Sequence, residues 1–438
     1  MLPTDNSGYA QANGTASNTV TVTSPPSNAA PTIALTGDNT ANEGQTKTYS
    51  FSVSTDSGAT SPYSVVSQSC GANGTPSNPV FNSATGAGSF DCTFPDGPAS
   101  STVSVQIADS GSANSNSNTP SIVVTIANVP PTIALTGASS VDEGSLYTLG
   151  LGAITDPGQD TVTAYSVDWG DGTIENFTGV PSGNKTHTYA DGPNNYTITV
   201  ALTDEDGTFA NAGSKAVTVD NVAPTISSLV AGAAAACGGS NTLAINFSDP
   251  AGTNDTYTAV VDWGDGNSDT YSNVSSGFPA SHAYALAGQY TASVTVSDED
   301  GGTSASASAT LTLNFTIVGG GILQPINPGP PLSLFKYKST IPVKIKVQDC
   351  DGSFPGTLAP TIKVTWVSGT TPPGTDEAIY STSAADTGTT MRFTDMPDYQ
   401  YIYNLATKSL SDATAKYHIT ITIPLTGQTV QADFGLKP

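Results

Sequence analysis

The sequence predicts an all-β chain, and three observations predict it. First, only 11% of the 438 residues are charged, while 44 are Gly and 30 are Pro; average globular chains carry about 25% charged residues. Second, the chain is poor in Lys, Glu, Leu and Met, the residues that favour helices. Third, its apolar residues are mainly Val, Ile, Tyr and Phe set among Thr and Ser, a mixture that packs well on pleated strands. Long helices are therefore excluded.

The length and the N-terminal residues bound the organisation. At roughly 100–150 residues per domain, the chain holds three or four domains. No run of 18 apolar residues occurs, so no membrane-spanning helix is expected, and Met1-Leu2-Pro3 does not begin a secretion signal. Thr15 to Pro31 resembles the last strand and linker of a domain whose beginning is missing. We therefore expect a piece of a longer extracellular or cell-surface protein, with signal and anchor absent from this chain.

The net charge of −24 lies upstream of residue 319. Residues 1–318 contain 27 acidic and three basic residues, whereas residues 319–438 contain nine of each. Nucleic acids and anionic membranes bind clustered Lys and Arg, so we expect no nucleic-acid partner and no direct membrane insertion. The acidic residues stand singly or in short groups between strand-like runs, unlike those of a disordered acidic tail. This balance favours cations as ligands.

Internal repeats organise residues 31–318. Pro31–Gly37 recurs identically at Pro131–Gly137, and Pro224-Thr225-Ile226 opens a third copy. Two acidic motifs each occur twice, 94 residues apart: Asp168–Gly172 with Asp262–Gly266, and Asp204–Gly207 with Asp298–Gly301. Ahead of the second motif, apolar residues alternate with polar ones at Tyr196, Ile198, Val200 and Leu202, and again at Tyr290, Ala292, Val294 and Val296. Such short alternating strands between Gly, Asp and Pro turns predict a series of sandwiches.

These residues resemble the polycystic kidney disease (PKD) domain, an immunoglobulin-like β-sandwich. The resemblance rests on the two Trp-Gly-Asp-Gly turns, on the triplets His187-Thr188-Tyr189 and His282-Ala283-Tyr284, and on the Tyr-led strand that ends in Asp. It is specific over residues 131–317. Residues 31–130 look like a degenerate copy that lacks the Trp-Gly-Asp-Gly turn, in which Asp96-Gly97-Pro98 parallels Asp191-Gly192-Pro193.

Residues 319–438 carry a different pattern. Pro342-Val343-Lys344-Ile345 resembles the Pro-x-Lys-Phe motif of a small C-terminal module of bacterial surface proteins, with Ile345 in place of Phe. Alternating apolar residues from Tyr417 to Ile423, a Thr426-Gly427-Gln428 turn and the returning Val430–Leu436 predict a hairpin on a further sandwich. Trp366 supplies a core aromatic ring. Gly319–Pro331 is predicted to be a linker or an irregular first edge.

The predicted architecture is therefore all-β, with tandem immunoglobulin-like β-sandwiches arranged as an extended rod. The resemblances imply a bacterial or archaeal surface protein. The predicted parts are the tail of a preceding repeat or a linker at 1–30, a degenerate PKD-like sandwich at 31–130, PKD-like sandwiches at 131–223 and 224–318, and a C-terminal β-sandwich module at 319–438.

The four Cys permit two disulfides in an oxidising compartment. When the first copy is aligned on the family's landmarks, Cys70 falls near the position of Trp169 and Cys92 at that of His187. The resemblance therefore implies a Cys70–Cys92 bridge across the first sandwich. Two free thiols are the alternative.

The second pair of Cys falls at a predicted domain junction. Cys237-Gly238-Gly239 stands where the second copy has Asp142-Glu143-Gly144, so the Glu of this loop is absent, and Cys350 follows a predicted strand of the last module. In the topology that the resemblance implies, these two loops face each other. We therefore predict an interdomain Cys237–Cys350 disulfide, again with unpaired thiols as the alternative.

The acidic turns fall where adjacent sandwiches should meet. In the immunoglobulin-like topology, the A–B loop of one sandwich lies beside the B–C and F–G loops of the next. Each junction then gathers a Glu, linker oxygens and four Asp. The candidate metal ligands are Glu43, Asn128, Asp156, Asp160, Asp204 and Asp206 at the first junction, and Glu143, Asp220, Asn221, Asp249, Asp255, Asp298 and Asp300 at the second.

Crowded carboxylates repel one another, and a bound cation relieves the repulsion. Ca²⁺ takes six to eight oxygen ligands in flexible geometry, whereas Mg²⁺ demands tighter octahedral coordination. We therefore expect Ca²⁺ as the cofactor, shared across the junctions. By analogy, some PKD domains bind calcium in these loops, and cadherin-like repeats stiffen their linkers with it. The alternative is that Asp-Glu-Asp-Gly is simply a good turn sequence with solvated carboxylates.

No catalytic site is expected. His187, His282 and His418 stand alone as core or strand residues, so no zinc cluster forms. The two carboxylates of Asp168–Gly172 could suggest an enzyme, but Gly-Asp-Gly makes a tight turn while its Trp packs inward. No Ser/His/Asp order, P-loop or dinucleotide motif occurs.

The sequence thus predicts a non-catalytic extracellular structural or adhesive stalk segment with calcium-stiffened junctions. One alternative is a subunit that self-assembles into a filament, sheath or virion decoration through an edge such as Leu332–Tyr337. Another is a polysaccharide-binding accessory region of a secreted hydrolase that uses exposed Tyr399, Tyr401 and Tyr403. The expected partners are other surface or matrix proteins, copies of the chain itself, or polysaccharide.

Overall fold

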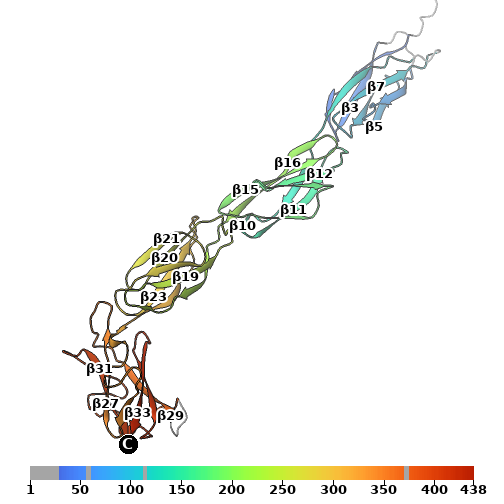
Figure 1. The fold of residues 1–438 in the computed structure, drawn as a ribbon. Coiled ribbons are helices and arrows are strands. Elements are labelled where there is room, and N and C mark those ends of the chain that lie inside the picture. Colours follow the sequence, from blue (N-terminus) through green and yellow to red (C-terminus); the bar gives the residue numbers. More distant parts are fainter. Residues whose placement is uncertain (1–28, 56–60, 112–115, 369–373) are drawn as a thin grey trace, which may run out of the picture. The chain divides into compact units, whose positions relative to one another are not determined.

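The computed structural model describes residues 29–55, 61–111, 116–368 and 374–438, whose strands are drawn in Figure 1. These residues form β-strands and two single-turn 3-10 helices, η1 (Val318–Gly320) and η2 (Thr407–Ser409), and no α-helix. In this part of the chain no helix is long and apolar enough to cross a membrane. The all-β prediction is confirmed, whereas the rod arrangement and the domain limits stay predictions. Most of Thr15–Pro31 lies outside the described residues.

The chain forms two compact units, and each is described by itself. The first comprises Met1–Ala138, Thr148–Thr186 and Tyr196–Ala216; the second comprises Ser139–Tyr147, His187–Asn195 and Val217–Pro438. The limits between the units pass through the second predicted sandwich.

The first sandwich belongs to the first unit and consists of two four-stranded sheets around one core. One sheet has the order β1 (Thr32–Thr36), β3 (Thr46–Thr55), β6 (Ala87–Thr93), β5 (Thr75–Asn82). The other has the order β2 (Thr40–Asn42), β8 (Ser121–Ala127), β7 (Ala99–Ala108), β4 (Ser64–Ser69). Alternate residues of β7 enter the core, so Val103, Val105 and Ile107 are buried with Tyr49 and Phe90.

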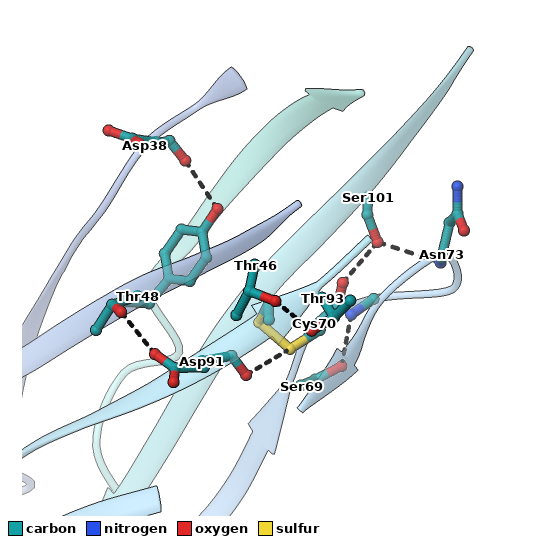
Figure 2. The surroundings of a disulfide bond; sticks show 12 residues. Asp38, Thr46, Thr48, Ser69, Cys70, Asn73, Asp91, Thr93 and Ser101 are labelled. Atoms are coloured by element: carbon teal, nitrogen blue, oxygen red, sulfur yellow. Dashed lines mark hydrogen bonds between the residues drawn. A yellow bond between two sulfur atoms is a disulfide. The ribbon is translucent and has the colours of Figure 1, made fainter. Parts of the chain in front are cut away.

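A disulfide between Cys70 and Cys92 joins these two sheets, as Figure 2 shows. Cys70 directly follows β4 and Cys92 lies within β6, and their Cα atoms are 5.6 Å apart. Both side chains are buried. The Ser101 hydroxyl donates a hydrogen bond of 2.6 Å to the carbonyl oxygen of Cys70 and so holds the end of β4 in place.

The strands of the second sandwich lie on both sides of the limits between the units. In the first unit, β9 (Thr132–Thr136) pairs with β11 (Leu146–Thr155), and β12 (Ala164–Asp168) pairs with β13 (Ile174–Thr178) and β15 (Asn194–Thr203). In the second unit, β10 (Ser140–Asp142) runs parallel to the end of β16 (Thr208–Asp220). The chain also forms β14 (Asn184–Thr188).

The third sandwich belongs to the second unit. Its smaller sheet has the order β17 (Thr225–Ala231), β19 (Asn241–Ser248), β22 (Phe278–His282). Its larger sheet has the order β18 (Ala235–Ala236), β24 (Ala307–Asn314), β23 (Gly288–Ser297), β20 (Tyr257–Asp262), β21 (Ser268–Val274). Along β23, Ala292, Val294 and Val296 are buried as the predicted alternation requires.

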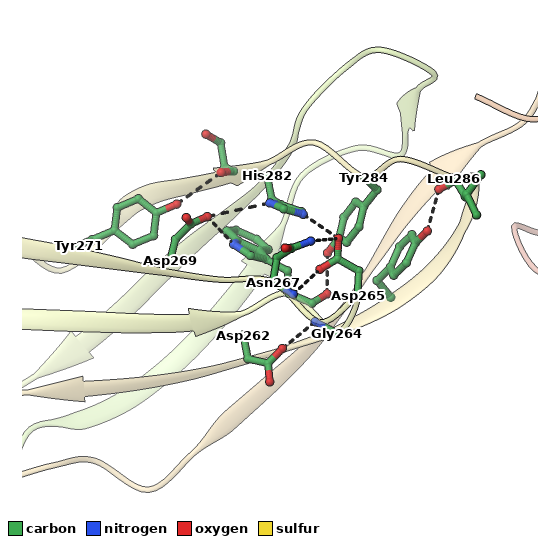
Figure 3. Close-up of polar contacts among 12 residues, drawn as sticks. Asp262, Gly264, Asp265, Asn267, Asp269, Tyr271, His282, Tyr284 and Leu286 are labelled. Carbon is green, nitrogen blue, oxygen red and sulfur yellow. Dashed lines mark hydrogen bonds and ion pairs between the residues drawn. The ribbon is translucent and has the colours of Figure 1, made fainter. Parts of the chain in front are cut away.

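The Trp-Gly-Asp-Gly turn and the His triplet form one structural unit in the third sandwich, shown in Figure 3. The rings of Trp263 and His282 stack with centroids 5.0 Å apart. His282 Nε2 lies 2.9 Å from Asp265 Oδ2, and Trp263 Nε1 donates to Asp269 Oδ2 over 2.8 Å. The Tyr284 hydroxyl donates to the carbonyl of Trp263 over 3.0 Å. Packing therefore explains why this motif is repeated within the chain. Its carboxylates take part in hydrogen bonds of the turn and of the neighbouring rings.

The last module packs two sheets around a core that contains Trp366. One sheet has the order β26 (Ser333–Lys336), β33 (Thr429–Lys437), β32 (Lys416–Thr422), β29 (Thr361–Ser368), and the other has the order β27 (Thr340–Ile345), β31 (Gln400–Ala406), β30 (Arg392–Thr394). The predicted terminal hairpin is confirmed by the antiparallel pairing of β32 with β33. A short antiparallel pair joins β25 (Thr316–Ile317), which precedes the module, to β28 (Val347–Gln348) within it.

The structure bears on two segments of the last module for which the sequence left alternatives open. Within Gly319–Pro331, Ile322 and Ile326 are buried in the core, so this segment is an irregular first edge and not a free linker. Leu332–Tyr337 was considered as an edge for a neighbouring molecule, but its strand β26 already pairs with β33 of the same chain. It forms the outer strand of that sheet.

Candidate metal centres at two junctions

Glu43 and Glu143 anchor two equivalent junctions. Each follows a short edge strand, and each side chain is almost fully buried, with exposures of 1% and 0%. Glu43 accepts hydrogen bonds from the backbone N–H groups of Gly97 and Val129, over 3.0 and 2.7 Å. Glu143 accepts the same pair of bonds from Gly192 and Val222, over 2.7 and 2.9 Å. The two Glu thus tie their A–B loop to the linker that leads into the next sandwich.

The glycine after each Glu lets the next sandwich come close. Gly44 has φ +68° and Gly144 has φ +66°, a region that residues with a side chain seldom adopt. A Cβ atom on Gly44 would lie 2.5 Å from the carbonyl oxygen of Pro157, and one on Gly144 would lie 2.7 Å from Cβ of Pro250. Both Pro belong to the B–C loop of the following sandwich. Glycine is therefore required at these positions for two reasons, the positive φ and the close approach of the following sandwich.

The first junction gathers carboxylates from the loops of the second sandwich. Asp156 and Asp160 come from the B–C loop, and Asp204 and Asp206 come from the F–G turn after β15. One oxygen of Asp156 and one of Asp204 accept bonds from their own turns, while the other oxygen of each is buried without a partner among the described residues. Both oxygens of Asp160 are likewise buried without a hydrogen-bond partner among the described residues. The oxygens of Asp156, Asp160 and Asp204 come within 4.8 Å of one another.

The second junction repeats this arrangement. Asp249 Oδ1 accepts a bond from the N–H of Ala251 over 2.9 Å, and its Oδ2 is buried without a hydrogen-bond partner in the part of the chain that the structure describes. Asp255, which is only 6% exposed, has two buried oxygens without a partner in the described chain. Oxygens of Glu143, Asp249 and Asp255 lie within 4.8 Å of one another. Asp298 is buried beside them and accepts a bond from Gly302 over 2.7 Å.

Two further Asp belong to these clusters but were not predicted as ligands. Asp96 has an oxygen within 4.8 Å of oxygens of Glu43, Asp160 and Asp206, and Asp191 groups in the same way with Asp255 and Asp300. Both come from the Asp-Gly-Pro loop before the F strand. The sequence contained a signal for them, because this loop lies at the same end of the sandwich as the A–B loop.

Among the linker residues, the two Asn side chains face the clusters, whereas the Asp220 side chain does not. The side-chain amides of Asn128 and Asn221 donate to Asp206 and Asp298, over 3.1 and 3.3 Å, and leave their Oδ1 atoms buried without a partner among the described residues. Both amide oxygens therefore remain available to a cation. The prediction for Asp220 is wrong: its carboxylate is exposed and lies outside both clusters, and only its carbonyl serves the junction, by accepting the N–H of Glu143 over 3.0 Å.

The crowding of carboxylates shifts their ionisation. Burial, followed by repulsion from Glu43 and Asp156, raises the pKa of Asp160 to about 7. Burial and repulsion from Glu143 and Asp249 raise the pKa of Asp255 to about 7. Among the described residues, no Lys, Arg or His forms an ion pair with these clusters. A positive charge is missing from both junctions.

The donor sets fit a hard cation. All the ligand atoms are carboxylate or amide oxygens, which suit Ca²⁺, Mg²⁺ and Mn²⁺, and the described clusters contain no Cys or His that would favour zinc. Several donors on separate loops give an irregular site, and Ca²⁺ tolerates such geometry better than Mg²⁺ does. The buried oxygens without partners would be satisfied by an ion, because an unpaired buried charge is costly.

The third junction lacks these donors. Cys237 stands at the position of Glu143 and forms a disulfide with Cys350, with Cα atoms 4.9 Å apart. Leu286 stands at the position of Asp191, and buried Phe315 follows β24 where Asn221 follows β16. The N–H of Ala287, which corresponds to that of Gly192, donates to Asp349 Oδ1 over 2.7 Å. A covalent bond and apolar packing thus replace the acidic set.

Two other candidate sites are not supported by the geometry. Asp168 and Asp171 each accept a backbone N–H within their own turn, over 2.9 Å, while Trp169 is buried. Tyr401 and Tyr403, considered as exposed rings for polysaccharide, are 1% and 0% exposed because their strand positions face the core. These two residues therefore cannot form a glycan-binding platform with Tyr399.

Comparison with known proteins identifies the repeats. Residues 128–219 and 221–313 each match the family model of the PKD domain, so the predicted tandem PKD domains are confirmed over these segments. The resemblance of residues 319–438 to the Pro-x-Lys-Phe module stays a prediction. No curated protein matches the chain.

Several solved multidomain structures are similar to parts of this chain. The chicken CNTN1 FN1–FN3 domains are 10% identical, with 71% of this chain and 99% of that chain covered and a TM-score of 0.23. The central fibronectin-III array of RIM-binding protein is 15% identical, with 71% and 98% covered and a TM-score of 0.18. The D00–D0 domain of intimin is 14% identical, with 42% and 96% covered and a TM-score of 0.19.

The tandem PKD domains and the two disulfides fit a non-catalytic structural or adhesive role in an extracellular protein.

Proposed function

We propose that this chain is a segment of an extracellular stalk in which calcium stiffens the first two junctions and a disulfide holds the third. The observation that carries the proposal is the meeting of carboxylates from two successive sandwiches at each of the first two junctions. Glu43 comes from one sandwich, Asp160 from the next, and their oxygens belong to one cluster. A calcium ion that is held by both residues can be bound only while the two sandwiches stay together.

The energetic consequence follows from mass action. An ion that binds the folded junction but not the unfolded chain stabilises the junction by about 2.7 kcal/mol at a hundredfold excess over its dissociation constant. Without the ion, mutual repulsion among the Asp opposes the closed junction. Calcium therefore selects one relative orientation of neighbouring sandwiches, and the segment projects or assembles a surface structure. Its partners would be surface or matrix proteins, or further copies of the chain.

The test compares the full chain with and without calcium. We expect calcium to raise the midpoint of thermal unfolding and to increase the maximum dimension measured by small-angle X-ray scattering, and a chelator to reverse both. A variant with Asp160→Asn and Asp255→Asn should lose both responses. An exposed pair, Asp142→Asn with Asp220→Asn, carries the same charge change outside the clusters and should keep them. Identical unfolding and scattering with calcium and with chelator would contradict the proposal.

A further inference from the structure

The carboxylates of each junction divide into two overlapping sets. At the first junction, one set consists of Asp156, Asp160 and Asp204, and the other of Glu43, Asp96, Asp160 and Asp206. At the second junction, one set consists of Glu143, Asp249 and Asp255, and the other of Asp191, Asp255 and Asp300. In every set the ligand oxygens lie within 4.8 Å of one another. The two sets at each junction share one residue and otherwise draw their oxygens from different residues.

A single Asp belongs to both sets at each junction. This residue is Asp160 at the first junction and Asp255 at the second. Both oxygens of each are buried and lack a hydrogen-bond partner in the described part of the chain. Asp255 is almost fully buried, with 6% of its surface exposed. A carboxylate with two free oxygens between two sets of donors is placed to bridge two cations, one on each oxygen.

The number of carboxylates also favours more than one ion at high pH, where all of them are ionised. At least six carboxylates lie at each junction: Glu43, Asp96, Asp156, Asp160, Asp204 and Asp206 form the two sets of the first, and Asp298 lies beside the Glu143, Asp191, Asp249, Asp255 and Asp300 that form the two sets of the second. When all six are ionised, one divalent cation leaves a charge of about −4 on the junction, and two leave about −2. Because like charges at such separations repel strongly in a partly buried site, the second ion removes most of the remaining repulsion.

The two sets differ in the solvent exposure of the Asp side chains that they do not share. Asp96 and Asp206 are exposed, and so is Asp300, whereas Asp204 and Asp249 are buried or half-buried. We name the set with Asp96 or Asp191 the outer set and the other the inner set. Amide oxygens of Asn128 and Asn221 lie beside these Asp and can complete the coordination.

We propose that each of the two junctions binds a pair of calcium ions, bridged by Asp160 or Asp255, and that Asp96 and Asp191 are ligands of the outer ion. This inference rests on the proposed function, because it assumes that the junctions bind calcium. It adds the number of ions, the bridging residue and two ligands that the repeats alone do not reveal.

The test counts bound ions by native mass spectrometry of the full chain, with isothermal titration as a second measure of stoichiometry. The wild-type chain should bind four calcium ions at saturation. A variant with Asp96→Asn and Asp191→Asn should bind two, because its inner sets remain intact. The Asp220→Asn variant is the matched control and should still bind four, since its exposed carboxylate lies outside both sets. Circular dichroism checks that all three chains are folded.

The possible outcomes separate the two proposals. Two ions on the wild type that persist in the Asp96→Asn, Asp191→Asn variant would overturn the paired-ion inference and leave calcium stiffening intact. Binding of no ion at all would overturn both. Four ions on the wild type with four on that variant would show that Asp96 and Asp191 are not ligands, and would overturn their assignment to the outer ion.

Discussion

Cys237 occupies in the third sandwich the position that Glu143 occupies in the second. Each directly follows an edge strand that runs parallel to the last strand of its sandwich: β10 pairs Asp142 with Asp220, and β18 pairs Ala236 with Asn314. Glu143 reaches the carboxylates of the next sandwich, whereas Cys237 is bonded to Cys350 of the next module. One position in the repeat thus holds either a carboxylate that lies beside those of the next sandwich or a disulfide to the following module.

Replacing Glu143 should separate its structural role from its role in calcium binding. Glu143→Ala removes the acceptor for the N–H groups of Gly192 and Val222, and we expect a loss of about 1–3 kcal/mol per unpaired group with or without calcium. Glu143→Gln keeps one acceptor oxygen and leaves one N–H group unpaired, so it should lose less stability than Glu143→Ala in chelator while losing the calcium-dependent part as well. Calorimetric unfolding in calcium and in chelator measures both. Asp142→Asn, an exposed neighbour, should leave both values unchanged; a Gln variant with the full calcium response would contradict the metal role.

A side chain at Gly144 should disrupt the second junction. Gly144→Ala places a methyl group 2.7 Å from Pro250, in addition to the cost of about 1–2 kcal/mol for a left-handed backbone with a Cβ. Gly238→Ala is a matched control, because Gly238 has a similar φ of +79° but no atom within 4 Å of its added Cβ. Urea unfolding and calcium titration should show a larger loss for Gly144→Ala. Equal losses would mean that the close approach of Pro250 is unimportant.

The stability of the calcium-free junctions should depend on pH. Burial and repulsion raise the pKa of Asp160 and of Asp255 to about 7, from an ordinary value of 3.8, so the folded junctions hold protons that the unfolded chain has released. The free energy of unfolding should therefore be highest near pH 4 and fall as the pH rises to about 7. With calcium present, affinity should rise over the same interval because the ion displaces these protons.

The measurement is urea unfolding of the calcium-depleted chain between pH 4 and 8, compared with the Asp160→Asn, Asp255→Asn variant. The comparison is needed because other carboxyls, such as Asp433, have a lowered pKa and act in the opposite direction. The wild type should lose more stability than the variant as the pH rises. Parallel curves for the two chains would show that these two Asp do not carry the effect.

Removing the Cys237–Cys350 disulfide should destabilise the third junction and leave calcium binding unchanged. The bond closes a loop of 113 residues, which in the chain-entropy account corresponds to about 4–5 kcal/mol, against about 3 kcal/mol for Cys70–Cys92 with its separation of 22. Paired Cys→Ser variants, followed by calorimetry and limited proteolysis, test this order. A Cys237→Ser, Cys350→Ser chain that unfolds and is cleaved like the wild type would contradict it.

The sequence predicted those features that repeat. The A–B, B–C and F–G loops were assigned from the paired motifs, because sandwich topology fixes the end at which each loop lies. Asp160 and Asp206 accordingly share a cluster with Glu43, and Asp156 and Asp204 share one with Asp160. The ions themselves stay a prediction.

The residues that sequence reasoning placed wrongly depend on the direction of single side chains. Asp220 follows Val219 in β16, and because Val219 faces the core, strand alternation turns Asp220 to solvent. The same alternation buries Tyr401 and Tyr403 with Leu405. Asp96 and Asp191 were missed because Asp-Gly-Pro served only as a landmark for aligning the copies, although its loop reaches the next sandwich.

The disulfide at the third junction makes the chain respond unevenly to its surroundings. A drop in free calcium should let the first and second sandwiches tumble independently, while the third continues to tumble together with the last module. A thiol reductant should act in the opposite way and free only the C-terminal end. If the first two junctions bind calcium as proposed, two solutes of unrelated chemistry would act on mobility at different points of a single polypeptide.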